Sequence, residues 1–420
     1  MDQVPLSSRL AVGRLAAEAV HAASSAAAEL SGSVVLPVDP VRLAVSYSSE
    51  RWFRLDGEQP SAFAPLSGFF RTSDGWVRTH GNYPHHAAAL RRALGLAEED
   101  GKDAATSAFS SRTSHEVSNE VERLGGLCVP VGIEVPGVDE ALREAPLVRV
   151  TLLGDSSPVP LTATDAGAPL RGIRVLDLTR VIAGPVGTSA LALLGADVLR
   201  IDPPRLPEIA WQHLDTGHGK RSAQLDLASP TGRARFDELL ATADVIALGY
   251  RAASLDALGL SPSALAARRP GIIVVRHSAW GEPGRRGFDS IVQAASGISW
   301  IESADGDAPG ALPAQALDHS TGYLLAAATM RLLSRRARAG GSWLAETSLR
   351  RVAATLLGMP RTAEREPAAS VIDPAGHLQT FEVGGRPVTT TAPAIAYEGA
   401  PGLFAAPRPW GEDDPAWLPA

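Results

Sequence analysis

One acidic residue, Asp318, stands in the run Ala316-Leu317-Asp318-His319-Ser320, where a long apolar helical pattern begins. At such a place an aspartate can cap the helix, because its carboxylate accepts a free backbone N–H group of the first turn. A carboxylate in the same position can also act as a covalent nucleophile. The residues themselves leave both interpretations of Asp318 open.

Two other segments carry groups that suit an anionic ligand. The turn Thr179-Arg180-Val181-Ile182-Ala183-Gly184 opens a helix, so backbone N–H groups at the helix start can meet an anion. In His218-Gly219-Lys220-Arg221-Ser222, two adjacent cations beside a glycine have the character of a phosphate clamp. A solvated loop is the alternative interpretation of that second segment.

Further polar and glycine-rich residues follow later apolar runs. Gly249-Tyr250-Arg251 follows one run, and the loop 277–289 places Trp280 and the pair Arg285-Arg286 after another. We expect these groups to suit an anionic, partly aromatic ligand. Asp202 also ends an apolar run, and we interpret it as a solvent-facing acid, with a ribose contact as the alternative.

The remaining nucleophile and ligand types fit structural roles. Cys128 lies between two apolar residues and is expected in the core. His319 is expected to be a surface or capping residue. His80, His85 and His86 lack carboxylate or cysteine partners at ligand spacing, so we expect surface groups and no metal site.

Short apolar runs alternate with helical patterns from residue 171 onward. Strands that alternate with helices of this length form βαβ units, in which the strands are parallel. We therefore expect an α/β fold with a parallel, Rossmann-like sheet covered by helices on both faces, plus a smaller α+β domain. Ligands bind such sheets beyond the carboxyl ends of the strands. The expected strands are 173–178, 196–201, 222–227, 244–248 and 272–275, and the expected helices are 186–194, 230–241, 261–268, 287–300 and 320–338.

Composition and pattern divide the chain into five segments. The first begins with one long helix over 8–30, the second contains a hairpin turn at Asp74-Gly75, and the last contains a hairpin near 381–388. The segments are an N-terminal helix followed by loops and turns (1–64), a small α+β domain (65–150), a Ser-, Pro- and Thr-rich linker (151–170), the sheet domain (171–350) and a closing segment (351–420).

The composition excludes several classes of protein. The 420 residues are 45% hydrophobic and 20% charged, which allows a sizeable core and excludes a disordered chain. A net charge of −7, from 46 acidic and 39 basic residues, provides no overall basic field for nucleic acid or an anionic membrane. The one cysteine allows no internal disulfide, which fits the cytoplasm. No apolar run approaches a membrane span, and charges such as Arg9 and Glu18 argue against a signal peptide.

A series of short fragments runs in a fixed order through the sheet domain. The fragments are Pro169-Leu-Arg-Gly-Ile-Arg-Val-Leu-Asp-Leu-Thr-Arg-Val-Ile-Ala-Gly-Pro185, 195–204, 219–227, 258–260, 287–289 with 293–297, and Ala316-Leu-Asp318. Together they resemble the class III CoA-transferases, the family that includes formyl-CoA transferase and carnitine CoA-transferase. The order and spacing of the fragments make the resemblance specific.

The order of the other parts differs from that family. There, a long helix and a small α+β domain follow the sheet domain. Here, similar sequence segments precede the sheet domain: Leu66-Ser-Gly-Phe-Phe-Arg-Thr-Ser-Asp-Gly-Trp76, Ala93-Leu-Gly95 and 125–131. The closing segment still follows the sheet domain. The chain therefore looks like a circular permutation, which proteins tolerate at exposed linkers.

The resemblance implies a CoA-transferase that moves CoA between an acyl-CoA thioester and a carboxylic acid. Asp318 takes the place of the family's nucleophile, which forms a mixed anhydride and then an aspartyl-CoA thioester. N–H groups at the helix start are expected to stabilise its ionised carboxylate. CoA is then a substrate, no metal or tightly bound cofactor is implied, and the partner is a second copy in an interlocked homodimer. The residues that the resemblance sets around CoA are Arg180, Val181, Ile182, Ala183, Gly219, Lys220, Arg221, Tyr250, Arg251, Arg286 and Asp289.

Three positions depart from the family's pattern and keep alternatives open. An Asn-aromatic pair and a downstream base are replaced by Gly249-Tyr250 and Ala257. A branch of the family that racemises 2-methylacyl-CoA has a histidine where this chain has Phe288, so we favour transfer over racemisation. A catalytically silent CoA-binding partner subunit is the further alternative.

Overall fold

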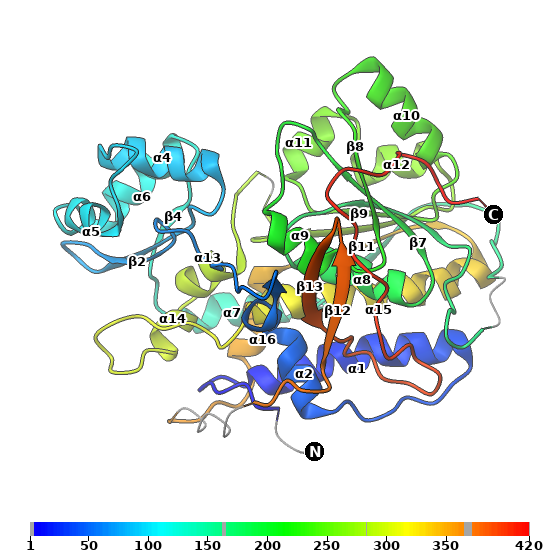
Figure 1. Cartoon of the computed structure of the whole chain (residues 1–420), viewed down its shortest axis with the longest axis horizontal. Coiled ribbons are helices and arrows are strands. Elements are labelled where there is room, and N and C mark those ends of the chain that lie inside the picture. The colour runs from blue at the N-terminus through cyan, green and yellow to red at the C-terminus, as the bar shows by residue number, and fades with distance from the viewer. Residues whose placement is uncertain (1–3, 162–164, 283, 365–371, 420) are drawn as a thin grey trace.

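The computed structural model describes residues 4–161, 165–282, 284–364 and 372–419. Its centre is a seven-stranded sheet in the order β5-β11-β10-β9-β6-β7-β8 (Figure 1). Neighbouring strands pair in parallel, except that β5 pairs antiparallel with β11. The predicted α/β class with a parallel sheet is therefore confirmed. The strands are β5 (Arg149–Gly154), β6 (Arg174–Leu178), β7 (Asp197–Asp202), β8 (Arg221–Gln224), β9 (Val245–Leu248), β10 (Ile273–Ser278) and β11 (Ser342–Ser348).

Helices cover both faces of this sheet. Neighbouring residues of a strand point to opposite sides, so a doubly covered strand is apolar throughout. In β6, Val175 packs into the core on one face and Leu176 into the core on the other. The first face carries α1 (Val12–Ser31), α8 (Ala183–Leu193), α13 (Asp289–Ala295), α14 (Ile298–Ile301), α15 (Ala316–Ala339) and α16 (Leu349–Leu357), and the second carries α10 (Pro230–Leu240), α11 (Ala252–Ala257) and α12 (Pro262–Arg268).

A smaller unit lies to one side of the sheet, at the upper left of Figure 1. Its antiparallel sheet has the order β2-β3-β4, and the predicted turn at Asp74-Gly75 joins the first two strands. Phe70, Val77 and Cys128 are buried in its own core, as expected for that cysteine. The elements are β2 (Gly68–Arg71), β3 (Trp76–Thr79), α4 (Pro84–Leu94), α5 (Lys102–Ser110), α6 (Ser114–Arg123) and β4 (Cys128–Pro130).

The front of the chain is built onto the large sheet. The predicted first helix is present as α1, which packs along α15 (Figure 1). The expectation of loops and turns up to residue 64 is wrong, because this stretch contains α2 (Pro40–Tyr47), α3 (Ser49–Trp52) and β1 (Arg54–Leu55). The carboxylate of Asp39 accepts the N–H groups of Val41 and Arg42, which is the capping contact that starts α2.

Residues 151–154, where we expected a linker to begin, belong to β5. This strand lies at the edge of the sheet and its side chains are largely exposed, so it lacks the apolar pattern of a buried strand. The predicted hairpin near 381–388 is confirmed. The elements not yet given are α7 (Pro136–Arg143), α9 (Ala210–Thr216), β12 (Leu378–Val383) and β13 (Arg386–Thr391), and β1, β13 and β12 form a third small sheet.

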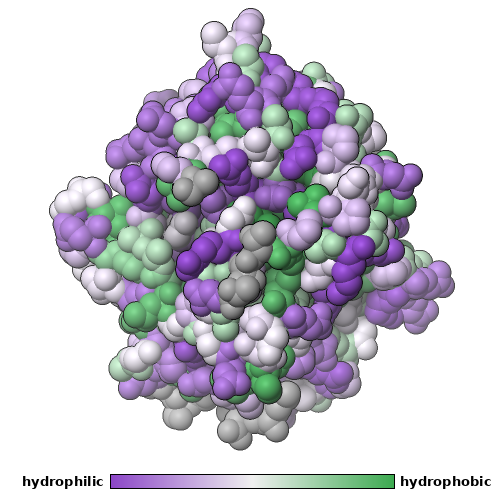
Figure 2. All heavy atoms as spheres, turned by 90° about the vertical axis from the view of Figure 1, so that its right-hand side faces the viewer, coloured by the Kyte–Doolittle hydropathy of each residue, from purple (hydrophilic) through white to green (hydrophobic). Residues whose placement is uncertain are grey.

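The surface is mixed in character. On the face shown in Figure 2, hydrophobic residues lie in small groups among hydrophilic ones. Among the helices of the described residues, none is both long enough and apolar enough to cross a membrane.

Candidate functional site

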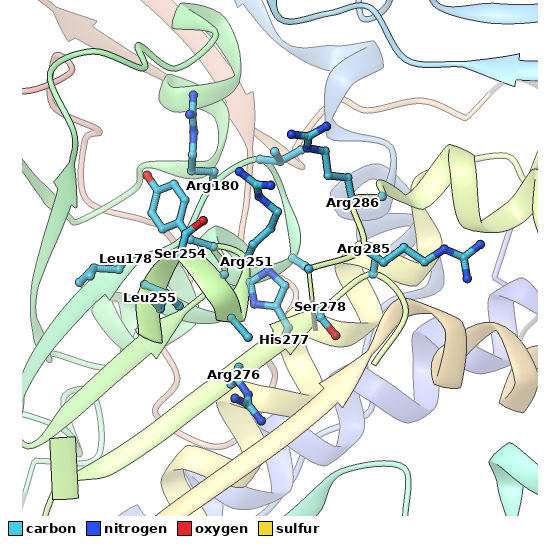
Figure 3. A pocket seen from close by; sticks show the side chains of 18 of the residues that line it. Leu178, Arg180, Arg251, Ser254, Leu255, Arg276, His277, Ser278, Arg285 and Arg286 are labelled. Carbon is cyan, nitrogen blue, oxygen red and sulfur yellow. The ribbon is translucent and has the colours of Figure 1, made fainter. Parts of the chain in front are cut away.

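A cleft of about 890 Å³ opens beyond the carboxyl ends of the central strands (Figure 3). A parallel sheet is predicted to bind its ligand at this edge. The first turn of α15, the start of α4 and Leu127 of the small unit also line the cleft. Among the described residues the arginines that line the cleft outnumber the acids, which favours an anionic ligand. They are Arg149, Arg180, Arg205, Arg251, Arg276, Arg285, Arg286 and Arg351, against Asp226, Glu282, Asp318 and Glu346.

Asp318 lines this cleft from the first turn of α15. The residue before the helix is Gln315, so the interpretation of Asp318 as the N-cap is wrong. Two glycines set its position, because α15 crosses α8 at very short range. A Cβ atom added at Gly322 would lie 2.6 Å from the carbonyl oxygen of Ala183, and one added at Gly187 would lie 2.8 Å from that of Gly322.

Asp289, at the start of α13, lies behind Asp318. Its Oδ2 accepts the backbone N–H of Asp318 at 3.0 Å, and its Oδ1 accepts a hydrogen bond from Nε2 of Gln293 at 2.5 Å. Asp289 is fully buried and does not line the cleft. It therefore holds the backbone that carries Asp318.

This arrangement changes the protonation of both carboxyl groups. Burial, with a smaller contribution from the charge of Asp289, raises the pKa of Asp318 well above its usual value. Burial also raises the pKa of Asp289 to about 6. The expectation that helix-start N–H groups stabilise the carboxylate of Asp318 is wrong in this structure, because the N–H of Asp318 itself is donated to Asp289.

Arg180 lies at the head of a buried charge network. It is 3.4 Å from Glu208, which also pairs with Arg200 at 2.9 Å and accepts a hydrogen bond from Tyr83 of the small unit at 2.5 Å. Burial alone would raise the pKa of Glu208, but the guanidinium groups of Arg200 and Arg180 lower it to about 2. The network connects the small unit to the large sheet.

Val181 is held in a strained conformation at the edge of the cleft. Its φ of +69° lies in the left-handed region, which a β-branched residue rarely adopts. Its N–H is donated to Oε2 of Glu208 at 3.2 Å. Strain of this kind concentrates at functional sites. Ala183 lines the cleft as well, whereas Ile182 between them is buried and does not.

The expected phosphate clamp is wrong, because Gly219, Lys220 and Arg221 do not line the cleft. Lys220 is 2% exposed and its Nζ lies 3.2 Å from Oδ2 of Asp177. Burial lowers the pKa of Lys220 to about 8, against the attraction of Asp177. Arg221 pairs with Asp197 at 2.7 Å. These cations stabilise the sheet and face no ligand.

Asp202 is also misassigned, since it is fully buried. It forms an ion pair with Arg200 at 2.7 Å and accepts hydrogen bonds from Tyr250 at 3.2 Å and Trp410 at 3.0 Å. Neither solvent nor a ribose has access to its carboxylate. The contact with Tyr250 fixes that ring in the wall of the cleft.

The lack of a side chain at Gly249 leaves room for the imidazole of His277, which also lines the cleft. A Cβ atom added at Gly249 would lie 2.5 Å from Cε1 of His277. The imidazole therefore occupies the space that any larger residue at 249 needs. Burial lowers the pKa of His277 to about 4, so the ring is neutral at neutral pH.

The expectation of surface histidines is wrong for His80, His86 and His319, which are buried. His80 stacks on Phe288 with ring centroids 3.8 Å apart, and His86 lines the cleft beside them. Burial lowers the pKa of both His80 and His86 to about 3. His319 stacks on Tyr47, on the far side of α15 from the cleft. Among the described residues, no group of His, Cys, Asp and Glu is arranged to hold a metal ion.

The structure thus brings together seven of the predicted site residues. These are Arg180, Val181, Ala183, Tyr250, Arg251, Arg286 and Asp318. Sequence reasoning missed Tyr83, Glu208 and Arg276. No local signal marks them, because each acquires its place from a partner distant in sequence, such as Glu346 for Arg276 at 2.5 Å.

Comparisons with known proteins identify a family that this chain matches. The model of the family described as CoA-transferase family III matches residues 170–405. The chain is 30% identical over 213 residues to a probable fatty acyl-CoA transferase of Mycobacterium tuberculosis, which covers 47% of this chain and 54% of that protein. It is 34% identical over 231 residues to an acyl-CoA transferase of Gibberella moniliformis, which covers 52% and 41%.

A third relative is the succinyl-CoA:glutarate CoA-transferase of Mus musculus, 30% identical over 197 residues, or 43% of this chain and 45% of that one. The chain spans about half the length of the curated relatives that it matches. A solved structure of a hypothetical protein from Mycobacterium tuberculosis is 32% identical and covers 45% of this chain and 57% of that chain. Its TM-score of 0.42 carries no argument about the arrangement of the parts.

Proposed function

The chain belongs to CoA-transferase family III, and from this premise we propose that it moves CoA between an acyl-CoA thioester and a carboxylic acid through a covalent intermediate on Asp318. One observation carries the proposal. Asp318 lines a large cleft at the ligand-binding edge of the sheet, and arginines outnumber acids on the walls of that cleft. A carboxylate beside a bound anionic thioester is the arrangement that acyl transfer to an aspartate requires.

The reaction that we propose has four steps. A carboxylate oxygen of Asp318 attacks the thioester carbonyl carbon, the C–S bond breaks, and a mixed anhydride and the CoA thiolate form. The thiolate attacks the Asp318 carbonyl carbon, which releases the donor acid and leaves an aspartyl-CoA thioester. The acceptor carboxylate attacks the carbonyl carbon of that thioester, the C–S bond breaks, and a second mixed anhydride and the CoA thiolate form. The thiolate then attacks the acceptor's carbonyl carbon, which releases the new acyl-CoA and restores the carboxylate.

The chain's own residues prepare the first step. Asp318 must be ionised to attack, yet burial and Asp289 raise its pKa. The arginines on the cleft walls and the CoA phosphates that bind to them determine the electrostatic potential at Asp318. We propose that Asp318 loses its proton in this environment. Arg180 and Arg251, with Tyr250 and the strained turn at Val181, are the residues that we propose for the nucleotide of CoA.

Trapping the intermediate tests the proposal. The protein is incubated with an acyl-CoA and hydroxylamine, which converts an activated carboxyl group to a hydroxamate, and is then analysed by peptide mass spectrometry. We expect the hydroxamate at Asp318, and none in D318N. D226N is the matched control. Asp226 is another acid of the cleft, paired with Arg205 at 3.6 Å, and this variant leaves Asp318 unchanged. A hydroxamate at another residue contradicts the assignment.

A second candidate function is a CoA-binding partner subunit without turnover. It is favoured by one observation: among the described residues, none donates a hydrogen bond to the carboxylate of Asp318, whose pKa is raised. This candidate predicts that CoA stabilises wild type and D318N equally against heat and that neither turns over. Racemisation has no such support, because Phe288 lines the cleft where racemising relatives have a histidine.

We also propose the finer points that the resemblance implies. They are a homodimer of interlocked chains, a circularly permuted order of domains and a cytoplasmic location. The packing of α1 along α15 and the pairing of β5 with β11 support the permuted order, because both join the front of the chain to the family-matching part. Analytical ultracentrifugation tests the dimer.

A further inference from the structure

A second, small cavity of about 40 Å³ lies against a different face of α15 from the cleft. It has room for an ion of the size of a water molecule and for one or two waters, since a water needs about 10–15 Å³ of such space. Elements that are distant in the sequence meet at this cavity, so a bound ion would contact several of them. Polar side chains line it from α2 (Ser46), α3 (Ser49), α8 (Ser189), α9 (Asp215) and α15 (His319 and Tyr323).

Asp215 brings a negative charge into this cavity. The residue is 7% exposed, and its Oδ2 accepts a hydrogen bond from Oγ of Ser49 at 2.6 Å. Within the described part of the chain, its Oδ1 has no hydrogen-bond partner. Burial raises the pKa of Asp215 to about 6, against the opposing effect of the bond from Ser49. The carboxyl group is therefore mainly ionised at neutral pH, and a buried charge without a counterion is costly.

The neighbouring side chains supply no positive charge to that carboxylate. Among the described residues, no lysine or arginine lines the cavity. The histidines that line it, His218 and His319, are neutral at neutral pH, because burial lowers their pKa to about 3 and about 4. Burial, with a smaller contribution from the charge of Asp215, raises the pKa of Glu50 to about 7, so a second acid lies nearby. The negative charge of Asp215 is therefore not compensated by these neighbours.

Ligand atoms for a cation surround the same space. The hydroxyl proton of Ser49 is used on Asp215, so the lone pairs of its oxygen remain for a ligand. Ser46 and Tyr323 share one hydrogen bond at 3.3 Å, which leaves an oxygen lone pair on each. One carboxylate among hydroxyl groups matches a single positive charge. A divalent ion would instead leave an excess positive charge in a buried place.

We propose that this cavity binds a monovalent cation, either ammonium or an alkali metal ion, between Oδ1 of Asp215 and the hydroxyl oxygens of Ser49 and Ser46. Nε2 of His319, which has no partner within the described residues, accepts a hydrogen bond from the ammonium ion or from a water on the metal ion. The ion thus joins α9 to α2, α3 and the first turns of α15. His319 directly follows Asp318, so the ion positions the start of the helix that carries Asp318. The inference does not depend on the reaction proposed at Asp318.

Thermal unfolding tests the site without any turnover. The protein is exchanged into choline chloride, whose cation is too large for the cavity, and is titrated with ammonium, potassium or sodium chloride at constant ionic strength. We expect at least one of the three small cations to raise Tm by roughly 2–5 °C near saturation. A response to ammonium alone identifies ammonium, and a response to potassium or sodium identifies an alkali metal ion. The same Tm in all four salts overturns the inference.

The variant D215N removes the charge and retains an oxygen that can accept the hydrogen bond from Ser49. We expect it to fold, with a Tm in choline chloride at or above that of the wild type, and to lose the response to the small cations. D226N is the matched control, because Asp226 already pairs with Arg205, and it should retain the response. A response that persists in D215N overturns the inference.

Thallium(I), an anomalous scatterer with the size and charge of potassium or ammonium, locates the ion. Crystals of the wild type soaked in thallium(I) acetate are expected to show an anomalous peak within contact distance of Oδ1 of Asp215, and crystals of D215N none. Ordered water alone in the cavity of the wild type, with no anomalous peak, overturns the inference.

Discussion

The carboxylate of Asp289 accepts the backbone N–H of Asp318, with an N···O distance of 3.0 Å. An acid from α13 therefore both anchors the backbone of Asp318, the nucleophile that we propose, and opposes its ionisation, because the two side chains are buried together. Like charges that share a site push a carboxyl pKa upward. Asp289 thus positions the backbone of Asp318 and adds to the effect of burial on its pKa.

The variant D289N is expected to move the pH dependence of the reaction. Without the charge of Asp289, the pKa of Asp318 falls, so the acidic limb of the kcat/KM profile shifts to lower pH. The measurement is the pH profile of kcat/KM with a single donor and acceptor. D226N serves as the control and is expected to leave the limb in place. If the acidic limb does not move in D289N, the charge of Asp289 does not affect the pKa of Asp318, and the prediction is wrong.

The variant D318N is expected to be more stable than the wild type at alkaline pH. A carboxyl group whose folded pKa is raised contributes stability below its unfolded pKa, and that contribution is lost as pH rises through the folded pKa. For Asp318 this loss begins as the pH rises above the usual pKa of an aspartate and continues through its raised folded pKa. We expect D318N to raise Tm by roughly 2–4 °C at pH 8 and by less at pH 4. Calorimetric scans at both pH values check this. If the Tm of D318N differs from that of the wild type by the same amount at both pH values, the prediction is wrong.

The variant G249A is expected to disturb the cleft through His277. The added Cβ would lie 2.5 Å from the ring, so the imidazole must move. Overpacking of this kind costs about 1–3 kcal/mol, and the displaced ring weakens CoA binding. Urea unfolding and calorimetry measure both effects. In G249A/H277A the conflict with the imidazole is gone and a contact of 3.2 Å with Cβ of Thr179 remains, so stability should return in part.

G137A is the matched glycine control for that experiment. Gly137 lies in α7, and an added Cβ there has no neighbour within 4 Å. Since alanine favours helix more than glycine does, G137A should be neutral or slightly stabilising. If G249A is as stable as G137A and binds CoA as tightly, the position of His277 does not depend on a glycine at 249.

The variant K220M is expected to unfold more easily while still binding CoA. It leaves the carboxylate of Asp177 buried without its cation, which costs about 3–5 kcal/mol. The double variant D177N/K220M removes both charges and should recover part of the loss. Chemical unfolding of the three proteins, with CoA titration below the unfolding transition, checks this. If K220M loses affinity for CoA while its stability is unchanged, Lys220 binds a phosphate of CoA and the prediction is wrong.

Sequence patterns predicted the elements that carry their own signal. A strand such as β9 is buried and apolar along its whole length, and the segment around Asp318 is helical, so both were predictable without tertiary information. The buried strand β11 was missed, because polar residues interrupt its apolar pattern. Lys220 was misassigned because a cation beside glycine has the same sequence whether it faces a ligand or Asp177, which lies 43 residues away. His80 was misassigned because its burial depends on Phe288, which reaches it only through folding. The edge strand β5 was missed because its partner β11 comes far later in the chain.

The packing of α1 along α15 bears on how the protein is made. A ribosome releases α1 long before α15, and β5 likewise leaves well ahead of β11. Until late in translation, the apolar face of α1 and the open edge of β5 have no native partner. Folding of this kind, dominated by distant contacts, is slow and exposes sticky surface. Wrong association during synthesis is therefore a greater risk at α1 and β5 than at elements whose partners lie close in the sequence.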